Sequence, residues 1–193
     1  AVILRIAGVY DDHCHSWPIS HQISRIYEKQ FESYLYPGQT DHGTAFVHLL
    51  DLADVFLRLI ERREELGEEE IFLIAEPGVM SYSELQDQLG TLIHHKRWPT
   101  IRIPKPVAKA GAWVKGKLAD EDEPELIQPW MVDLADDHYE ASITKARTKL
   151  GWIPKRRLRT TLPSMIEHLR EDPVHFYEEH ELPIPEEMPE NAG

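Results

Sequence analysis

The sequence predicts an α/β fold, made of the end of a doubly wound parallel sheet and a small, mainly helical region. Two short apolar runs, residues 2–7 and 71–74, are typical of strands in a parallel sheet, where helices cover both faces. Helical patterns between and after these runs have the spacing of crossover connections. The chain has 193 residues, 41% apolar and 28% charged, which is enough for a domain with a sizeable core.

Strands and helices are expected to alternate over residues 1–95. The expected strands are residues 2–7, 34–36, 45–48 and 71–74, and the expected helices are 19–31, the segment from Leu49, and 82–94. Leu52, Phe56 and Ile60 recur at four-residue spacing, which gives the helix from Leu49 one buried face. Ser81 and Glu84 have the spacing of a capping box, which predicts the start of the last of these helices.

Beyond residue 95 the pattern becomes mainly helical. A brief strand at 101–103 precedes a helix over 107–118 and an acidic breaker at 120–125. Residues 172–193 are rich in Pro and Glu, so we expect a helical turn followed by an acidic, frayed tail.

Two further helices are predicted from their end signals. Ser142 is expected to cap a helix that ends at Gly151. Thr161 is expected to cap a helix that carries Pro163 in its first turn, where proline is tolerated.

Charge and composition exclude several classes of partner. The 34 acidic residues outnumber the 21 Lys and Arg and give a net charge of −13, which disfavours nucleic acid and anionic membrane surfaces. The single cysteine, Cys14, excludes an internal disulfide, and no apolar run approaches the roughly 20 residues of a membrane span. These features predict a cytoplasmic protein.

The first residues are not a signal peptide, because they lack an initiator Met, a charged start and a cleavage site. They resemble instead a strand from the middle of a sheet whose earlier strands would precede Ala1. Too few strands follow to complete that sheet, so we expect residues before Ala1 in the natural protein. An unfinished sheet exposes strand edges and an apolar face, which predicts self-association.

Three segments, in the same order, resemble the extended short-chain dehydrogenase/reductase family, which includes the NAD-dependent epimerases and dehydratases. Residues 2–10 are similar to the family's sixth strand and the loop beneath the nicotinamide, and residues 46–53 to its His-x-x-Asp-Leu-Ala segment. Residues 145–154 are similar to its Lys-Ala followed by Leu-Gly-Trp-x-Pro. The resemblance implies the C-terminal portion of a Rossmann-like domain over 1–95 and a helical substrate-binding region over 96–171.

The resemblance also implies where a parent enzyme would hold its ligands. Ala7, Gly8 and Val9 correspond to the backbone that approaches the nicotinamide of NAD or NADP. The substrate, a sugar nucleotide or a smaller hydroxy or carbonyl compound, is expected to contact residues of the loop from Tyr10 to Ser20 and the stretch from Thr44 to His48. The expected substrate residues are Tyr10, His13, His15, Trp17, Arg25, Thr44 and Phe46.

Two departures from the family bear on the substrate. Gly8 stands where sugar-nucleotide epimerases often carry Asn, and Thr44 where many carry an Arg that can hold a diphosphate. They favour a substrate that is smaller or uncharged, unless Arg25 binds the anion instead.

The catalytic groups of the family are absent from this sequence. It contains no Gly-rich dinucleotide turn, and none of its seven tyrosines is followed four positions later by a lysine. That lysine would lower the tyrosine pKa and allow acid–base chemistry near neutral pH. We therefore predict no catalytic residues and no cofactor bound by this chain alone. A binding or sensing protein that kept the scaffold is the main alternative.

Residues 11–15, Asp-Asp-His-Cys-His, contain every side chain a zinc site could use, which raises a metal-dependent activity as a third hypothesis. Consecutive residues rarely converge on one ion, and a tetrahedral site would need ligands from elsewhere in the fold. We therefore predict no metal and interpret the two histidines as pocket or loop residues.

Other polar and aromatic residues have structural explanations. We interpret His48 and Asp51 as a strand-to-helix junction with a carboxylate in the first turn, and His94 and His95 as cations at a helix end. Trp113, Trp130 and Trp152 are expected to pack in the interior.

Overall fold

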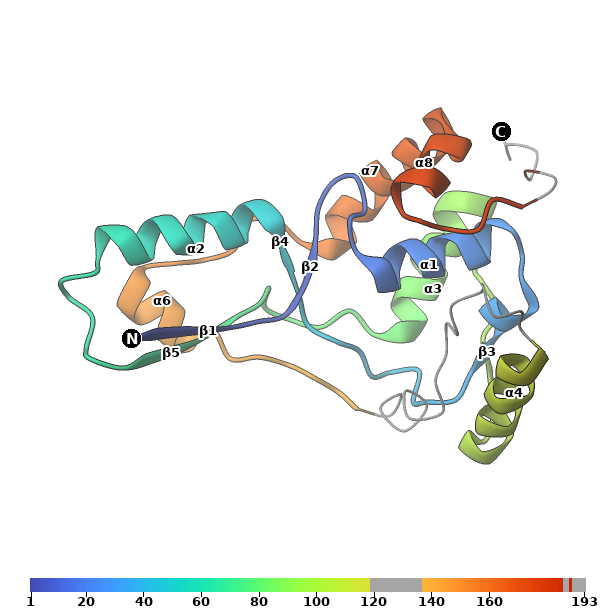
Figure 1. Cartoon of the computed structure of the whole chain (residues 1–193), viewed down its shortest axis with the longest axis horizontal. Coiled ribbons are helices and arrows are strands. Elements are labelled where there is room, and N and C mark those ends of the chain that lie inside the picture. The colour runs from blue at the N-terminus through green and yellow to red at the C-terminus, as the bar shows by residue number, and fades with distance from the viewer. Residues whose placement is uncertain (119–136, 186–187, 189–193) are drawn as a thin grey trace.

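Three pairs of parallel strands form the backbone of the structure, a computed structural model that describes residues 1–118, 137–185 and 188. They are β1 (Val2–Ile6) with β5 (Glu70–Ile74), β2 (Gly8–Tyr10) with β4 (Phe46–His48), and β3 (Leu35–Tyr36) with β6 (Ile101–Arg102). Figure 1 shows the pairs following one another along the molecule. The Ala7 N–H donates to the Ile74 carbonyl at 3.0 Å and the Glu76 N–H to the Phe46 carbonyl at 2.7 Å, which joins the first two pairs.

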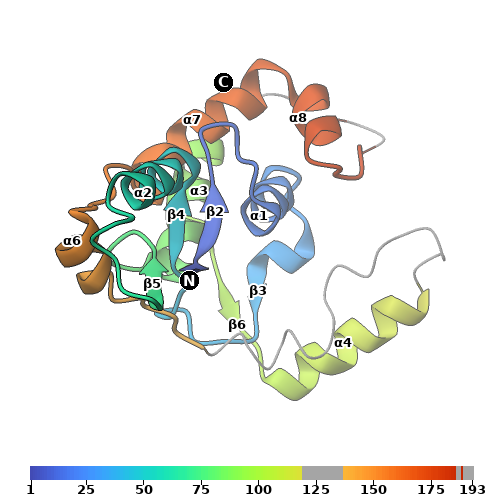
Figure 2. The ribbon, with the colours of Figure 1, turned by 60° about the vertical axis from the view of Figure 1, so that its left-hand side comes forward.

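The described residues form seven α-helices, so the predicted α/β class is confirmed. These are α1 (Trp17–Tyr27), α2 (Leu49–Glu61), α3 (Tyr82–His94), α4 (Lys105–Leu118), α6 (Thr144–Leu150), α7 (Leu158–Glu171) and α8 (Pro173–Glu179), with a short 3-10 turn at Phe31–Tyr34. In the view of Figure 2 the β2–β4 pair lies between α2 and α1. None of the described helices combines the length and the apolar character that a membrane span requires.

Only one face of the β1–β5 pair is covered among the described residues. Phe72 and Ile74 are buried in a core with α2 and α6, whereas Ile71 and Leu73 alternate with them and are exposed. Among the described residues, helices cover one face of this pair and the other face exposes apolar side chains, as expected. Burial alternates along β5 with a period of two residues. The sequence does not reveal this alternation, because the side chains on both faces are apolar.

Two clusters of buried side chains form the interior. One joins α1, α3, α7 and α8, and the other joins β4, β5, α2, α6 and Trp152. The first cluster contains residues from both sides of the boundary expected at residue 95, and the division into regions stays a prediction. Phe176 and Tyr177 are fully buried in it, so the helical turn expected after Asp172 is confirmed and is the packed helix α8. Trp130 lies outside the described residues, as do the side chain of Trp113 and most of the chain after residue 185.

Several predicted helix ends are confirmed. Ser81 caps α3 by accepting from the Glu84 N–H at 3.2 Å, while the Glu84 carboxylate accepts from the Ser81 N–H at 3.0 Å. Gly151 ends α6 with a positive φ of 62°, a conformation that glycine adopts without steric cost.

Three other helix ends differ from the predictions. The first helix ends at Tyr27 rather than at residue 31, and Lys29 has a φ of 57°. Ser142 does not cap α6, because its hydroxyl donates to the Thr144 hydroxyl at 3.1 Å.

Pro163 lies inside α7 rather than in its first turn, because this helix begins at Leu158 and Thr161 is not its cap. Pro163 has no N–H to give to the Arg159 carbonyl one turn earlier. The Gln88 side chain of α3 donates to that carbonyl instead, at 2.6 Å. A side chain on another helix therefore compensates for the proline, which the local sequence does not reveal.

Glu70 at the start of β5 binds two lysines of α6. Its carboxylate lies 2.7 Å from Lys145 Nζ and also pairs with Lys149, while the Glu70 side chain is only 5% exposed. Hydrogen bonds from Lys145 and then Lys149 lower the pKa of Glu70 to about 2. This ion-pair group connects α6 to the strand pair.

Stability is expected to fall as the pH drops below about 4.5, partly because Glu70 becomes protonated. A carboxylate whose pKa is lowered on folding contributes stability above its unfolded pKa, and that contribution is lost as the pH falls toward about 2. Thermal melting of Glu70→Gln between pH 6 and pH 3 should show a shallower loss of Tm than the unmodified chain. Parallel curves for the two proteins would contradict the role given to this group.

Candidate substrate and cofactor site

The residues expected to approach a cofactor lie at the junction of the first two strand pairs. Ala7 is hydrogen-bonded to the end of β5, and the Gly8 N–H donates to the Ala45 carbonyl at 3.2 Å. A Cβ atom on Gly8 would lie 2.8 Å from two ring carbons of Phe46, closer than such atoms approach in proteins. The Phe46 ring therefore requires glycine at position 8, and the Gly8 backbone stays exposed.

Tyr10 is fully buried and its hydroxyl donates to the Glu76 carboxylate at 2.9 Å. The same carboxylate oxygen accepts the Leu158 N–H at 2.9 Å, so Glu76 connects the end of β2 to the start of α7. Burial raises the pKa of both Tyr10 and Glu76. Tyr10 offers no exposed surface to a ligand in this conformation. Glu76 was not identified from the sequence, although its position just after β5 is where polar residues of such sheets meet.

His48 and Asp51 have structural partners, in line with their interpretation as a strand-to-helix junction. His48 Nδ1 accepts from the Leu50 N–H at 3.1 Å and caps α2. Its Nε2 is buried without a hydrogen bond, 3.5 Å from an Asp12 oxygen, and burial lowers the pKa of this imidazole. Asp51 accepts from the backbone N–H groups of Lys155 and Arg156 at 2.9 and 2.8 Å.

The loop after β2 directs its two histidines toward the C-terminal helices. Asp11 accepts from the backbone N–H groups of His13 and His15 at 3.1 and 2.9 Å and from the His15 ring at 2.7 Å. Cys14 has a φ of 75° and is buried in the core. The rings of His13 and His15 contact His168 of α7 and Glu179 of α8. Their partners therefore belong to α7 and α8, not to the β2–β4 pair.

The remaining expected substrate residues have separate surroundings. Trp17 is 54% exposed, and its ring lies 4.4 Å from that of His21. Arg25 is partly buried, and burial lowers the pKa of its guanidinium. Thr44 is exposed and forms an isolated parallel bridge with Tyr139. The structure thus brings Phe46 close to residues 7–10, and His13 close to His15. Trp17, Arg25 and Thr44 belong to neither group.

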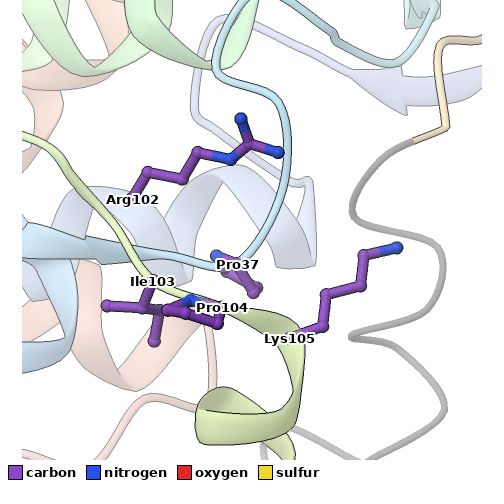
Figure 3. Close-up of a pocket in the computed structure, with 5 residues that line it drawn as sticks. All are labelled: Pro37, Arg102, Ile103, Pro104 and Lys105. Atoms are coloured by element: carbon purple, nitrogen blue, oxygen red, sulfur yellow. The ribbon is translucent and has the colours of Figure 1, made fainter.

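A pocket of about 330 Å³ lies where β3 and β6 end. It is lined by Pro37, Arg102, Ile103, Pro104 and Lys105. Figure 3 shows Arg102 and Lys105 on either side of Pro37, with Ile103 and Pro104 beneath. The Ile103 N–H donates to the Tyr36 carbonyl at 2.9 Å, which fixes the two sides of the pocket. None of these residues was predicted, because the sequence has denser groups of cations, such as Lys155-Arg156-Arg157, and does not single out this pair.

Comparison with known proteins identifies the fold. No family model matches the sequence, and no curated protein is similar to it. Solved structures that match include a UDP-glucose 4-epimerase with UDP-glucose from Thermotoga maritima (20% identity, TM-score 0.55) and a UDP-glucuronic acid 4-epimerase with UDP-glucuronic acid and NAD from Bacillus cereus (16%, 0.56). An epimerase from Methanothermobacter thermautotrophicus also matches (14%, 0.59).

These three matches cover 88%, 88% and 91% of this chain but only 46%, 45% and 44% of the respective epimerases. The chain therefore spans less than half the length of these structures and has part of their Rossmann-like fold. The predicted resemblance to NAD-dependent epimerases is confirmed for the fold.

Proposed function

We propose that the chain is the C-terminal, substrate-binding portion of an NAD(P)-dependent epimerase, dehydratase or reductase of the extended short-chain dehydrogenase/reductase family. The fold shared with solved epimerases over about nine-tenths of this chain carries the proposal. The three segments of sequence resemblance support it, because they pack together. The β2 strand pairs with β4, and the Trp152 indole N–H donates to the Asp51 carbonyl at 3.0 Å.

For the cofactor, we propose that Ala7, Gly8 and Val9 face the nicotinamide end of NAD or NADP. The exposed backbone of Gly8 fits close approach by a flat ring, and the junction of two strand pairs holds it rigidly. When bound, the nicotinamide supplies hydride transfer. The sequence has neither the Gly-rich turn nor the Tyr-x-x-x-Lys pair, so the residues present fit one end of the dinucleotide only.

For the substrate, we propose a sugar nucleotide whose phosphates lie near Arg102 and Lys105. Guanidinium and ammonium groups stabilise phosphate oxygens by charge-assisted hydrogen bonds. Two cations beside one pocket favour this substrate over the smaller or uncharged compound that Gly8 and Thr44 suggest. The loop around His13 and His15 and the exposed Trp17 are proposed to select the sugar.

Calorimetric titration of the purified chain tests both parts of the proposal. UDP-glucose and UDP are expected to bind, glucose alone is not, and Arg102→Gln should weaken UDP-glucose binding about tenfold. Arg147→Gln, on an exposed residue of α6, is the matched control and should bind normally. NAD, NADH and NADPH should give no detectable heat.

Two results would contradict the proposal. Equal affinity of Arg102→Gln and the unmodified chain for UDP-glucose would exclude the phosphate site. Dinucleotide binding tighter than about 10 μM, or about 7 kcal/mol, would mean that this chain builds a complete cofactor site.

A binding or sensing protein without catalysis remains the second candidate. The same fold would serve such a protein, because a ligand site can persist on a fold after the chemistry, here the Tyr-x-x-x-Lys pair of the family, is lost. Ligand binding by a full-length protein that also lacks this pair would support this alternative.

We also propose that the chain associates with itself through its uncovered apolar surface. Ile3 and Ile71 are register partners on the strand pair and are 53% and 44% exposed, and Leu73 on the same face is 36% exposed. Apolar side chains gathered on one surface commonly mark an interface.

A further inference from the structure

A group of histidines surrounds Glu179 at the place where the loop after β2 meets α7 and α8. Its members are His13, His15, His168, His175 and His180. Ligand atoms of His13, His168 and Glu179 all lie within 4.8 Å of one another. Nothing in the proposed sugar-nucleotide function requires so many imidazoles around one carboxylate.

We propose that His13, His168 and Glu179 bind a divalent transition-metal ion, with zinc as the best match. Two imidazoles and one carboxylate are a set that zinc uses in proteins, with the fourth position left to water or another ligand. Calcium and magnesium prefer oxygen ligands, and two of the three ligand groups here are imidazole nitrogens. The site uses none of the residues proposed to face the nicotinamide or the phosphates, and it shares His13 and His15 with the loop proposed to select the sugar.

The ligand atoms are close to the required spacing. His168 Nε2 and Glu179 Oε2 are 2.7 Å apart and share a hydrogen bond. A tetrahedral zinc with bonds of about 2.1 Å places its ligand atoms about 3.4 Å apart. Zinc binding would therefore move His168 Nε2 and Glu179 Oε2 slightly apart and bring the His13 ring closer to both. His13 lies on an exposed loop, which permits that movement.

Neighbouring groups hold the ligands in place. His15 connects the Asp11 carboxylate, at 2.7 Å, to the second oxygen of Glu179, at 3.1 Å. Asp11 also accepts the backbone N–H groups of His13 and His15, so it fixes the loop that carries the first ligand. Outer carboxylate and imidazole partners of this kind orient metal ligands in known sites.

His180 provides an independent observation. Its Nδ1 lies 2.6 Å from the Phe176 carbonyl, which can only accept, so this nitrogen carries the proton of the neutral ring. The Nε2 atom then presents a lone pair, and it is buried without a hydrogen-bond partner in the described structure. The ring is 5.5 Å from that of His15. The cluster therefore holds another imidazole nitrogen that no group of the described residues satisfies.

The objection to a metal raised by the sequence is answered by the fold. Residues 11–15 cannot surround one ion by themselves, and Cys14 points into the core. The further ligands come from α7 and α8, more than 150 residues along the chain. They are brought to the loop by the buried cluster that contains Leu169 and Phe176.

Zinc titration of the chain without an affinity tag tests this proposal. We expect one Zn²⁺ per chain with a dissociation constant below about 10 μM, and a tetrahedral absorption spectrum with Co²⁺. His168→Gln and Glu179→Gln should each weaken Zn²⁺ binding at least tenfold, and His15→Gln by a smaller factor. His95→Asn, at the distant end of α3, is the control and should bind Zn²⁺ normally; Asn suits the left-handed backbone there.

Failure of the unmodified chain to bind Zn²⁺ or Co²⁺ at 100 times that concentration, about 1 mM, would overturn the proposal. So would binding that His168→Gln and Glu179→Gln leave unchanged. If a variant does not fold by circular dichroism, nitrogen-15 NMR of the imidazoles in the unmodified chain decides the matter. Zn²⁺ should then shift the ring signals of His13 and His168 and leave those of His94 and His95 in place, and the reverse pattern would exclude the site.

Discussion

Replacing Asp51 by alanine is expected to lower the free energy of unfolding by about 3 kcal/mol. Asp51 is 2% exposed and accepts hydrogen bonds from the Lys155 and Arg156 N–H groups and from the Arg156 guanidinium, the last at 3.0 Å. Truncation would leave two backbone donors without their acceptor and separate α2 from the segment before α7. Urea unfolding followed by circular dichroism measures the loss.

Asp54→Ala is the matched control for this experiment. Asp54 lies one turn further along α2 and pairs with Arg58 at 2.8 Å, but both side chains are partly exposed. Solvent screens such a pair, so its removal should cost less than about 1 kcal/mol. Equal losses for the two variants would show that Asp51 does not hold the segment in place.

Replacing Trp152 by alanine is expected to cost about 3–5 kcal/mol, the largest effect predicted for a single side chain. The ring is fully buried in the cluster with Phe72 and Ile74, and its N–H donates to the Asp51 carbonyl. Alanine would leave a large cavity between α2, α6 and β5 as well as an unmatched carbonyl. Guanidinium unfolding monitored at 222 nm by circular dichroism would measure this change without relying on tryptophan fluorescence.

Two other variants provide comparisons for the stability loss expected of Trp152→Ala. Trp152→Phe keeps most of the apolar volume and loses the hydrogen bond, so it should cost roughly half as much as alanine. Trp17→Ala removes a ring that is 54% exposed and should change stability by less than about 1 kcal/mol. A small effect at position 152, comparable to that at position 17, would mean that the second cluster is not well packed.

Local patterns in the sequence were sufficient for much of the fold. The strands at 2–7 and 71–74, the capping box at Ser81 and the glycine stop at Gly151 depend on neighbouring residues and were predicted correctly. The start of α7 was not, because it depends on distant partners. Glu76 accepts the Leu158 N–H, and Gln88 compensates for Pro163, and neither residue is near α7 in the sequence.

The candidate sites can likewise be divided into features predicted from the sequence and features that depend on distant parts of the fold. The resemblance assigned residues 7–9 to the nicotinamide and Phe46 to the substrate, and only the strand pairing reveals that Gly8 lies opposite Phe46. Sequence reasoning did not find Arg102 and Lys105, since their pocket forms only when β3 and β6 meet. It also gave no reason to connect His13 with His168 and Glu179, because helix packing alone brings these segments together.

The proline in α7 has a consequence for how α3 and α7 are aligned. An ordinary helix offers a neighbouring side chain no free carbonyl in its interior, so the interdigitated side chains alone align two packed helices. Pro163 creates a single free acceptor at Arg159, and the amide of Gln88 reaches it at 2.6 Å. A shift by one turn would break this hydrogen bond, so one missing N–H favours one longitudinal register for the two helices.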